Sequence, residues 1–195
     1  MRIITTETTI KKILMTVGFY FFDEICVRLI FRLCLESRRF ELLSVKMTRD
    51  IITLFIFLVF IFHTKIVEKH DFKISFCKLF LAFFLVFIFL MTTGNAKQEV
   101  DPRTIFHALI FSPIIEEVIS RKVIFSGLKE SGHIVLGIIL STLLFVSLHV
   151  DFSITGLIYF TIMSFALMLI QLWTNSVINS ILLHSFINFV ILFIF

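Results

Sequence analysis

Two adjacent glutamates inside an apolar segment are the first residues of this sequence that could do chemistry. Glu116 and Glu117 lie in the stretch FSPIIEEVISRKVIF, and Arg121 follows four residues after Glu117. In a helix of about 3.6 residues per turn, Glu117 and Arg121 share a face and can form an ion pair, whereas Glu116 points roughly 100° away. Glu116 is therefore expected to lack that partner and to suit a general base or acid.

Pro113 precedes the two glutamates by less than one helical turn. Proline lacks a backbone N–H, so it is predicted to kink the helix and to open space beside the carboxylates. The Glu117–Arg121 pair has a plain structural interpretation, which is charge neutralisation at a helix end near the membrane interface. A carboxylate inside the membrane without a local partner is costly, so Glu116 favours a functional interpretation.

Two further polar positions recur at four-residue spacing on later apolar segments. Phe145 and His149 end the block HIVLGIILSTLLFVSLHV, and His184 and Asn188 lie within NSVINSILLHSFINFVILFIF. Taken singly, His149 could be an interfacial histidine, and His184 and Asn188 could bond only to neighbouring helices. Two hydrogen-bonding groups directed together into a helix bundle could also bind an oxyanion in a dry site.

The three patterns EExxxR, FxxxH and HxxxN occur in this order on successive apolar segments. They can converge only if those segments pack as helices around a shared cavity. As an ordered set, they resemble the three motifs of the CPBP family, the type II CAAX proteases and bacteriocin-processing enzymes that are also called Abi proteins. The resemblance covers residues 104–195, about half of the chain.

This resemblance implies an all-helical intramembrane endopeptidase. Glu116 would be the general base that activates water, and His149 would position that water. His184 and Asn188 would stabilise the tetrahedral oxyanion. The two remaining motif residues would orient the site; they are Glu117 and Arg121.

The cofactor stays open at this point. The family is often described as metal-dependent, and Glu116, His149 and His184 form a set that could bind a divalent metal such as zinc. Their spacing is not HExxH, and a metal-free Glu/His mechanism fits equally well. Two positions depart from the family pattern: Lys122 stands where glycine is common, and Ser120 where an aromatic residue is frequent. These changes are expected to affect helix packing and the mouth of the site.

The composition requires lipid as part of the solvent. The chain has 195 residues, of which 58% are hydrophobic and 27 are Phe, and its mean hydropathy is +1.05. Soluble domains are about 45–50% apolar, and a fold of this size has too little interior to bury the excess. A multi-pass protein of the cell membrane is predicted, and the Phe-, Ile- and Leu-rich character favours a bacterial cytoplasmic membrane. The net charge of +4 forms no basic patch with stacking aromatics, so nucleic-acid binding is not expected.

The elements that must position the motif residues are apolar blocks long enough for membrane helices. We predict an all-α, polytopic transmembrane bundle of about six to seven membrane-embedded helices. The first block carries the charged stripe Glu24, Arg28 and Arg32, so it could lie in the interface or pack against the bundle. The chain is predicted to be one integrated membrane domain, with residues 1–103 as N-terminal helices of unassigned role and 104–195 as the catalytic core. The blocks cover residues 13–35, 51–67, 74–93, 104–126, 133–150, 153–173 and 176–195.

The leading functional hypothesis is hydrolysis of a peptide bond in a hydrophobic or membrane-associated peptide or protein. Two alternatives use the same residues. One is a non-catalytic membrane protein for immunity or regulation, such as bacteriocin self-immunity. The other is an ion or proton pathway, since intramembrane Glu and His also occur there.

Overall fold

Every regular element of the described chain is helical, so the predicted all-α class is confirmed. The computed structural model describes residues 6–35, 42–93, 101–149 and 153–194, and within these ranges there is no β-strand. The first half contains α1 (Thr6–Leu35), α2 (Leu42–His63), the 3-10 helix η1 (Lys69–Phe72) and α3 (Phe76–Thr93). The second half contains α4 (Pro102–Phe106), η2 (His107–Phe111), α5 (Ser112–Glu117), η3 (Val118–Ser126), α6 (Gly127–Glu130), α7 (Ile134–Leu148), α8 (Ile154–Thr174) and α9 (Val177–Phe193).

The helices follow the predicted apolar blocks, but only one described helix is long and apolar enough by itself to cross a membrane. That helix is α8. Three shorter apolar helices span Phe76–Thr92, Ile134–Leu148 and Val177–Phe193. In the first block, Glu24 and Arg28 form an ion pair along α1, and the side chain of Arg32 lies outside the described residues.

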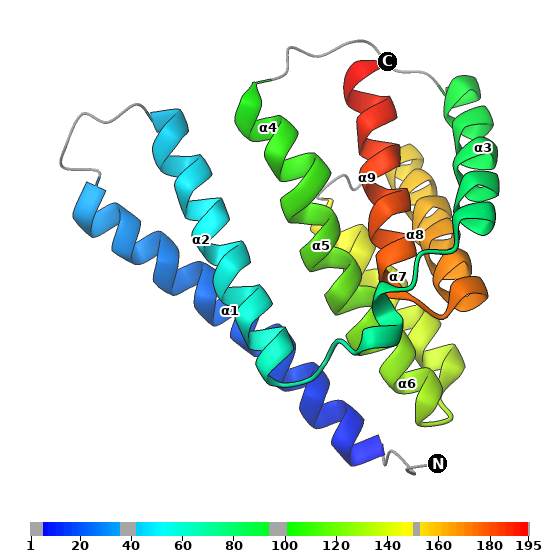
Figure 1. The fold of residues 1–195 in the computed structure, drawn as a ribbon, viewed down its shortest axis with the longest axis horizontal. Coiled ribbons are helices and arrows are strands. Elements are labelled where there is room, and N and C mark those ends of the chain that lie inside the picture. Colours follow the sequence, from blue (N-terminus) through cyan, green and yellow to red (C-terminus); the bar gives the residue numbers. More distant parts are fainter. Residues whose placement is uncertain (1–5, 36–41, 94–100, 150–152, 195) are drawn as a thin grey trace.

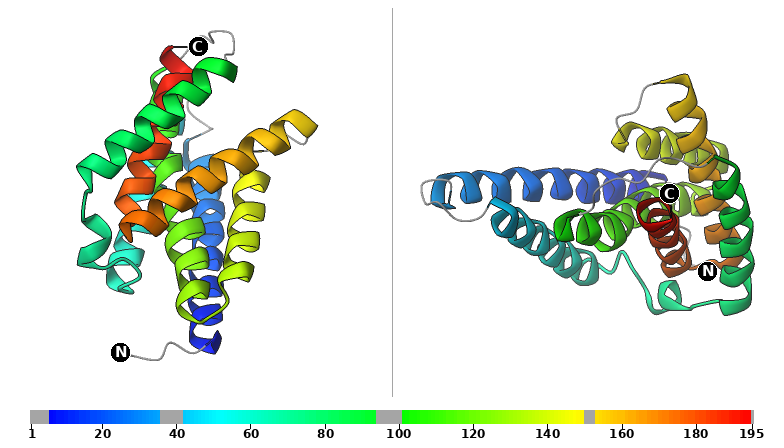
Figure 2. Two further views of the ribbon diagram at one scale, coloured as in Figure 1. Left: turned by 90° about the vertical axis from the view of Figure 1, so that its right-hand side faces the viewer. Right: turned by 90° about the horizontal axis from the view of Figure 1, so that it is seen from above.

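Helix α9 lies at the centre of the C-terminal half. In Figure 1 it stands between the α4–α5 segment on one side and α8 and α3 on the other, and it contacts η2, α5, α8 and α3. Helices α1 and α2 pair side by side, and their far ends extend away from the other helices (Figure 2, right). The near end of α1 packs against η3 and α6.

The segment from Pro102 to Glu130 is helical throughout and contains two stretches of wider winding. It opens at Asp101, whose side chain accepts a hydrogen bond from the Thr104 backbone N–H at 2.9 Å; this bond holds the pKa of the exposed Asp101 carboxyl below its ordinary value. Two stretches are π-helical, η2 directly before Pro113 and η3 directly after Glu117. Such widened turns occur mostly as short insertions and often at functional sites.

The turn before Pro113 is completed by side chains from α9. Proline cannot donate to a carbonyl of the preceding turn, which leaves backbone oxygens to be satisfied in another way. Ser185 donates its hydroxyl to the Leu109 carbonyl at 2.8 Å, and Asn188 donates its amide to the Ala108 carbonyl at 2.7 Å. The irregularity predicted from Pro113 is thus a widened helical turn, stabilised by hydrogen bonds from α9.

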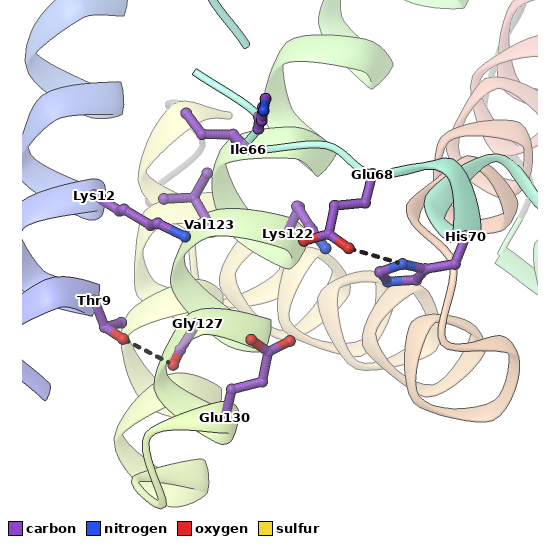
Figure 3. Close-up of a pocket in the computed structure, with 10 residues that line it drawn as sticks. Thr9, Lys12, Ile66, Glu68, His70, Lys122, Val123, Gly127 and Glu130 are labelled. Atoms are coloured by element: carbon purple, nitrogen blue, oxygen red, sulfur yellow. Dashed lines mark hydrogen bonds and ion pairs between the residues drawn. The ribbon is translucent and has the colours of Figure 1, made fainter. Parts of the chain in front are cut away.

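Among the contacts between the N-terminal half and the rest of the chain, two involve η3 and the start of α6. Thr9 of α1 donates to the Gly127 carbonyl at 3.4 Å (Figure 3), and a Cβ at residue 127 would lie only 3.0 Å from the Thr9 methyl group. Glycine therefore permits this close approach. Lys122 of η3 pairs with the buried Asp71 of η1 at 2.8 Å, so the lysine that departs from the family pattern joins η3 to the α2–α3 connection.

Candidate active site

Three motif side chains from three different helices meet in the interior. Glu116 comes from α5, His149 follows the end of α7, and His184 comes from the middle of α9. One potential ligand atom from each lies within 4.8 Å of the others. The convergence that the order of the motifs predicts is therefore present in the structure.

Glu116 has one oxygen held and one oxygen free. Ser112, one turn earlier on the helix, donates its hydroxyl to Glu116 Oε1. Glu116 Oε2 is buried and has no hydrogen-bond partner among the described residues. It lies 3.9 Å from His149 Nε2, which is too long for a direct hydrogen bond but short enough for both atoms to contact one water molecule.

His149 is oriented by the aromatic residue of its own motif. Its Nδ1 lies 2.8 Å from the Phe145 carbonyl oxygen, which can only accept, so Nδ1 carries a proton. In the neutral ring, Nε2 then presents a lone pair toward Glu116. The ring packs between Phe145 and Phe160, with centroid distances of 4.5 and 4.2 Å, which fixes this orientation.

Glu117 has the opposite surroundings, because it is enclosed and paired on both sides. Its Oε2 lies 3.3 Å from Arg121 Nε, and its Oε1 lies 3.2 Å from His184 Nδ1. The ion pair predicted from the four-residue spacing is present, and the side chains of both partners are fully buried. Since the carboxylate accepts from His184 Nδ1, the other ring nitrogen, Nε2, remains available for chemistry.

Arg121 is the largest fully buried side chain of the described structure. Three further contacts compensate the burial of its charge. One terminal nitrogen donates to Ser141 Oγ at 2.5 Å, and the other donates to Ser164 Oγ at 3.2 Å. Its guanidinium group lies 5.0 Å from the centre of the Phe145 ring, within the range of a cation–π interaction. Arg121 therefore connects η3 to α7 and α8.

Asn188 borders the same small cavity as His149 and His184, which has a volume of about 50 Å³. One of its amide protons is donated to Ala108, and an amide NH2 group has a second proton to donate. The structure therefore brings Asn188 beside the two histidines and also uses it to hold the widened turn.

The polar partners of the motif residues were not identified from the sequence. Ser112 precedes Glu116 by four residues, so the spacing rule that pairs Glu117 with Arg121 could have found it. Ser141 and Ser164 lie on other helices and have no sequence relation to Arg121.

Glu116 also borders a second, larger cavity of about 170 Å³ between α1, α5 and α7. Most of its wall is apolar. Glu116 thus borders the larger apolar cavity on the α1 side, and His149 and His184 border the small one on the α8–α9 side.

The donor set suits a zinc ion chemically. Both histidines have Nδ1 engaged by an oxygen acceptor, which leaves two Nε2 atoms and one Glu116 oxygen as ligands, and such outer partners are typical of metal-binding histidines. Ligands of a tetrahedral zinc ion are about 3.4 Å apart, from zinc–ligand lengths near 2.1 Å. The Glu116–His149 separation of 3.9 Å is close to this value, so Glu116, His149 and His184 could hold such an ion.

Comparison with known protein families agrees with the geometry. The family described as type II CAAX prenyl endopeptidase Rce1-like matches residues 99–190. This range contains Glu116, Glu117, Arg121, His149, His184 and Asn188. Residues 99–190 are thus similar to this branch of the CPBP family, which is membrane-embedded and in general a family of proteases. No curated protein and no solved structure matches the chain.

Proposed function

We propose that this protein is an intramembrane endopeptidase that hydrolyses a peptide bond in a hydrophobic or membrane-associated substrate. The observation that carries the proposal is the pair of acceptor atoms, Glu116 Oε2 and His149 Nε2, which face each other at 3.9 Å. In the proposed state Glu116 is ionised and the His149 ring is neutral, so both atoms accept hydrogen bonds. A water molecule between them donates one proton to each and directs a lone pair outward.

The proposed reaction is a simple hydrolysis. The water oxygen attacks the carbonyl carbon of the scissile bond while Glu116 takes the water proton. The carbonyl oxygen becomes an oxyanion, which accepts hydrogen bonds from His184 Nε2–H and from the second amide proton of Asn188. When the carbon–nitrogen bond breaks, Glu116 returns the proton to the leaving nitrogen, and an acid and an amine are released.

In this mechanism His184 is an imidazolium, because it donates from Nδ1 to Glu117 and from Nε2 to the oxyanion. Glu117 and Arg121 then act as positioning residues. Their pairing holds His184 in place and supplies the negative charge beside its ring.

We further propose that the helices form a multi-pass membrane bundle. Large apolar side chains point outward on several helices, which a soluble protein of this size would not expose in such number. On α3, the exposed fractions of Phe76 and Phe80 are 76% and 74%, and on α8 that of Ile154 is 78%. Hydrocarbon chains of lipid would cover these faces.

The proposal is tested by the Glu116→Gln variant, which keeps the shape of the side chain but cannot take a proton. Loss of the general base should lower kcat/KM by about 10²–10⁴-fold. The assay uses purified protein in lipid vesicles and a mixture of internally quenched hydrophobic peptides. The matched control is Glu130→Gln, which changes a carboxylate on the same helical segment outside the cluster. Full activity of Glu116→Gln would overturn the mechanism.

Metal analysis of the purified protein distinguishes a metal-dependent from a metal-free mechanism. When bound, a zinc ion would supply Lewis-acid activation of the water, and its ligands would be Glu116, His149 and His184. Stoichiometric metal in the purified protein, lost in the His149→Ala variant, would assign a metalloprotease. Activity that persists after chelation in metal-depleted protein would assign the metal-free mechanism.

The non-catalytic alternative predicts a different result for the same variant. An immunity or regulatory protein works by binding, so its cellular effect should survive Glu116→Gln. Retention of the full effect by this variant would therefore contradict proteolysis.

A further inference from the structure

The apolar cavity of about 170 Å³ next to Glu116 is built partly by α1, which lies outside the segment that matches the protease family. Val17, Tyr20 and Phe21 form the α1 side of its wall. Ile115 and Leu144 belong to the opposite side, on α5 and α7. Helix α1 contacts η3, the helical stretch that follows α5.

The size of the cavity fits one large side chain. An engineered protein cavity of about 150 Å³ with apolar walls binds benzene. The cavity beside Glu116 is slightly larger, at about 170 Å³. A phenylalanine, leucine or methionine side chain would therefore occupy it, whereas alanine would leave most of it empty.

The polar atoms of the wall indicate that the occupant is part of a peptide. Ser112 and Glu116 lie on the wall and are hydrogen-bonded to each other, so one part of the cavity borders the catalytic carboxylate. A peptide places an apolar side chain directly beside polar backbone groups. A lipid acyl chain has no polar group to set against Glu116, so the mixed wall favours a substrate residue.

The α1 wall is held from behind by α2. The rings of Tyr20 and Phe57 meet edge to face with centroids 5.9 Å apart, and Phe57 is fully buried. Phe19 stacks on Phe60 with a centroid distance of 3.8 Å. These contacts fix the position of α1 across the cavity, so the size of residue 17 should set the space available.

We propose that this cavity binds the side chain of a substrate residue adjacent to the scissile bond, and that Val17 of α1 determines the size of side chain accepted. This inference rests on the proposed protease function and deepens it. It assigns the N-terminal helices a role in selecting a substrate with a large apolar residue at the cleaved bond.

The experiment compares cleavage-site profiles on a peptide mixture, read by mass spectrometry. The wild-type protein should cleave next to Phe, Leu or Met. The Val17→Phe variant fills the cavity, so its preference should move to Ala or Gly, with a change of at least about tenfold in the ratio of kcat/KM for large and small residues. The matched control is Val135→Phe, because Val135 lies on the outer face of α7 and is 65% exposed; its profile should stay that of the wild type.

A second variant covers the case in which Val17→Phe does not fold. Val17→Ala enlarges the cavity and should raise the relative rate for Trp at the same position. Cleavage with profiles that neither variant changes would overturn the inference while leaving the protease function intact. No cleavage by the wild-type protein would overturn the proposed function and this inference with it.

Discussion

The two sides of the helical turn that carries Glu116 and Glu117 have different surroundings. On one side, Glu117 is fully buried, and both of its oxygens face a cationic or N–H partner. On the other side, Glu116 borders a cavity and keeps one oxygen without a hydrogen bond. Glu116 and Glu117 are thus identical and adjacent in sequence, yet Glu117 is enclosed by its partners and Glu116 faces a cavity.

The surroundings of Glu117 illustrate how a buried ion pair is compensated. Burial of an ion pair costs several kcal/mol per ion and is offset only when further hydrogen bonds complete the pair. Ser141, Ser164 and His184 provide those bonds around Glu117 and Arg121. Around Glu116, Ser112 donates to one oxygen, and the other oxygen is left for the proposed role as general base.

The largest expected effect on stability follows from removing Arg121, the cation that pairs with Glu117. Arg121→Met removes the cation of this buried ion pair and leaves Glu117 with His184 as its remaining partner, so the free energy of unfolding should fall by about 3–5 kcal/mol. Unfolding of the detergent-solubilised protein measures it. Glu116→Gln serves as the comparison and should change stability by less than about 1 kcal/mol, because no ion pair is broken.

A double variant tests whether charge is the cause. Glu117→Gln combined with Arg121→Met removes both charges and keeps an acceptor for His184. It should be more stable than Arg121→Met alone. Equal or greater loss in the double variant would show that packing of Arg121, and not the unpaired carboxylate, dominates.

A smaller effect is expected at the serine that supports Arg121 from α7. Ser141→Ala removes the acceptor of one guanidinium N–H in a fully buried place. Hydrogen bonds to charged groups contribute about 1.5–3 kcal/mol, so a loss of that size is expected. Ser147→Ala is the control, because its hydroxyl bonds only to the carbonyl of its own helix in an exposed position. Equal losses in the two variants would contradict the assigned role of Ser141.

The smallest expected effect, on activity, follows from a change at Ser112, which is hydrogen-bonded to Glu116. Ser112→Ala removes the hydrogen bond to Glu116 Oε1 and should lower kcat/KM by up to about tenfold, the equivalent of one ordinary hydrogen bond. Stability should change little, because Glu116 is partly exposed to the cavity. Steady-state kinetics would show the effect in kcat, and a loss confined to KM would contradict a role in positioning the base.

The sequence by itself determined the features that depend on local spacing. Apolar blocks predicted the helices, since hydrophobic length and backbone hydrogen bonding leave few alternatives in lipid. The interval from Glu117 to Arg121 predicted their ion pair, and the same rule could have paired Ser112 with Glu116. The order of the three motifs predicted that Glu116, His149 and His184 converge, but gave no distances. The predicted number of membrane-embedded helices stays a prediction, because among the described helices α8 alone is long and apolar enough by itself to cross a membrane.

Only the tertiary structure decided which distant groups complete the site. Ser141 and Ser164 meet Arg121, and Asn188 meets Ala108, through the packing of helices that no sequence interval relates. The same packing brings Val17 of α1 to the wall beside Glu116. The physical reason is that hydrogen bonds along a helix follow its repeat, whereas contacts between helices depend on how all their side chains fit together.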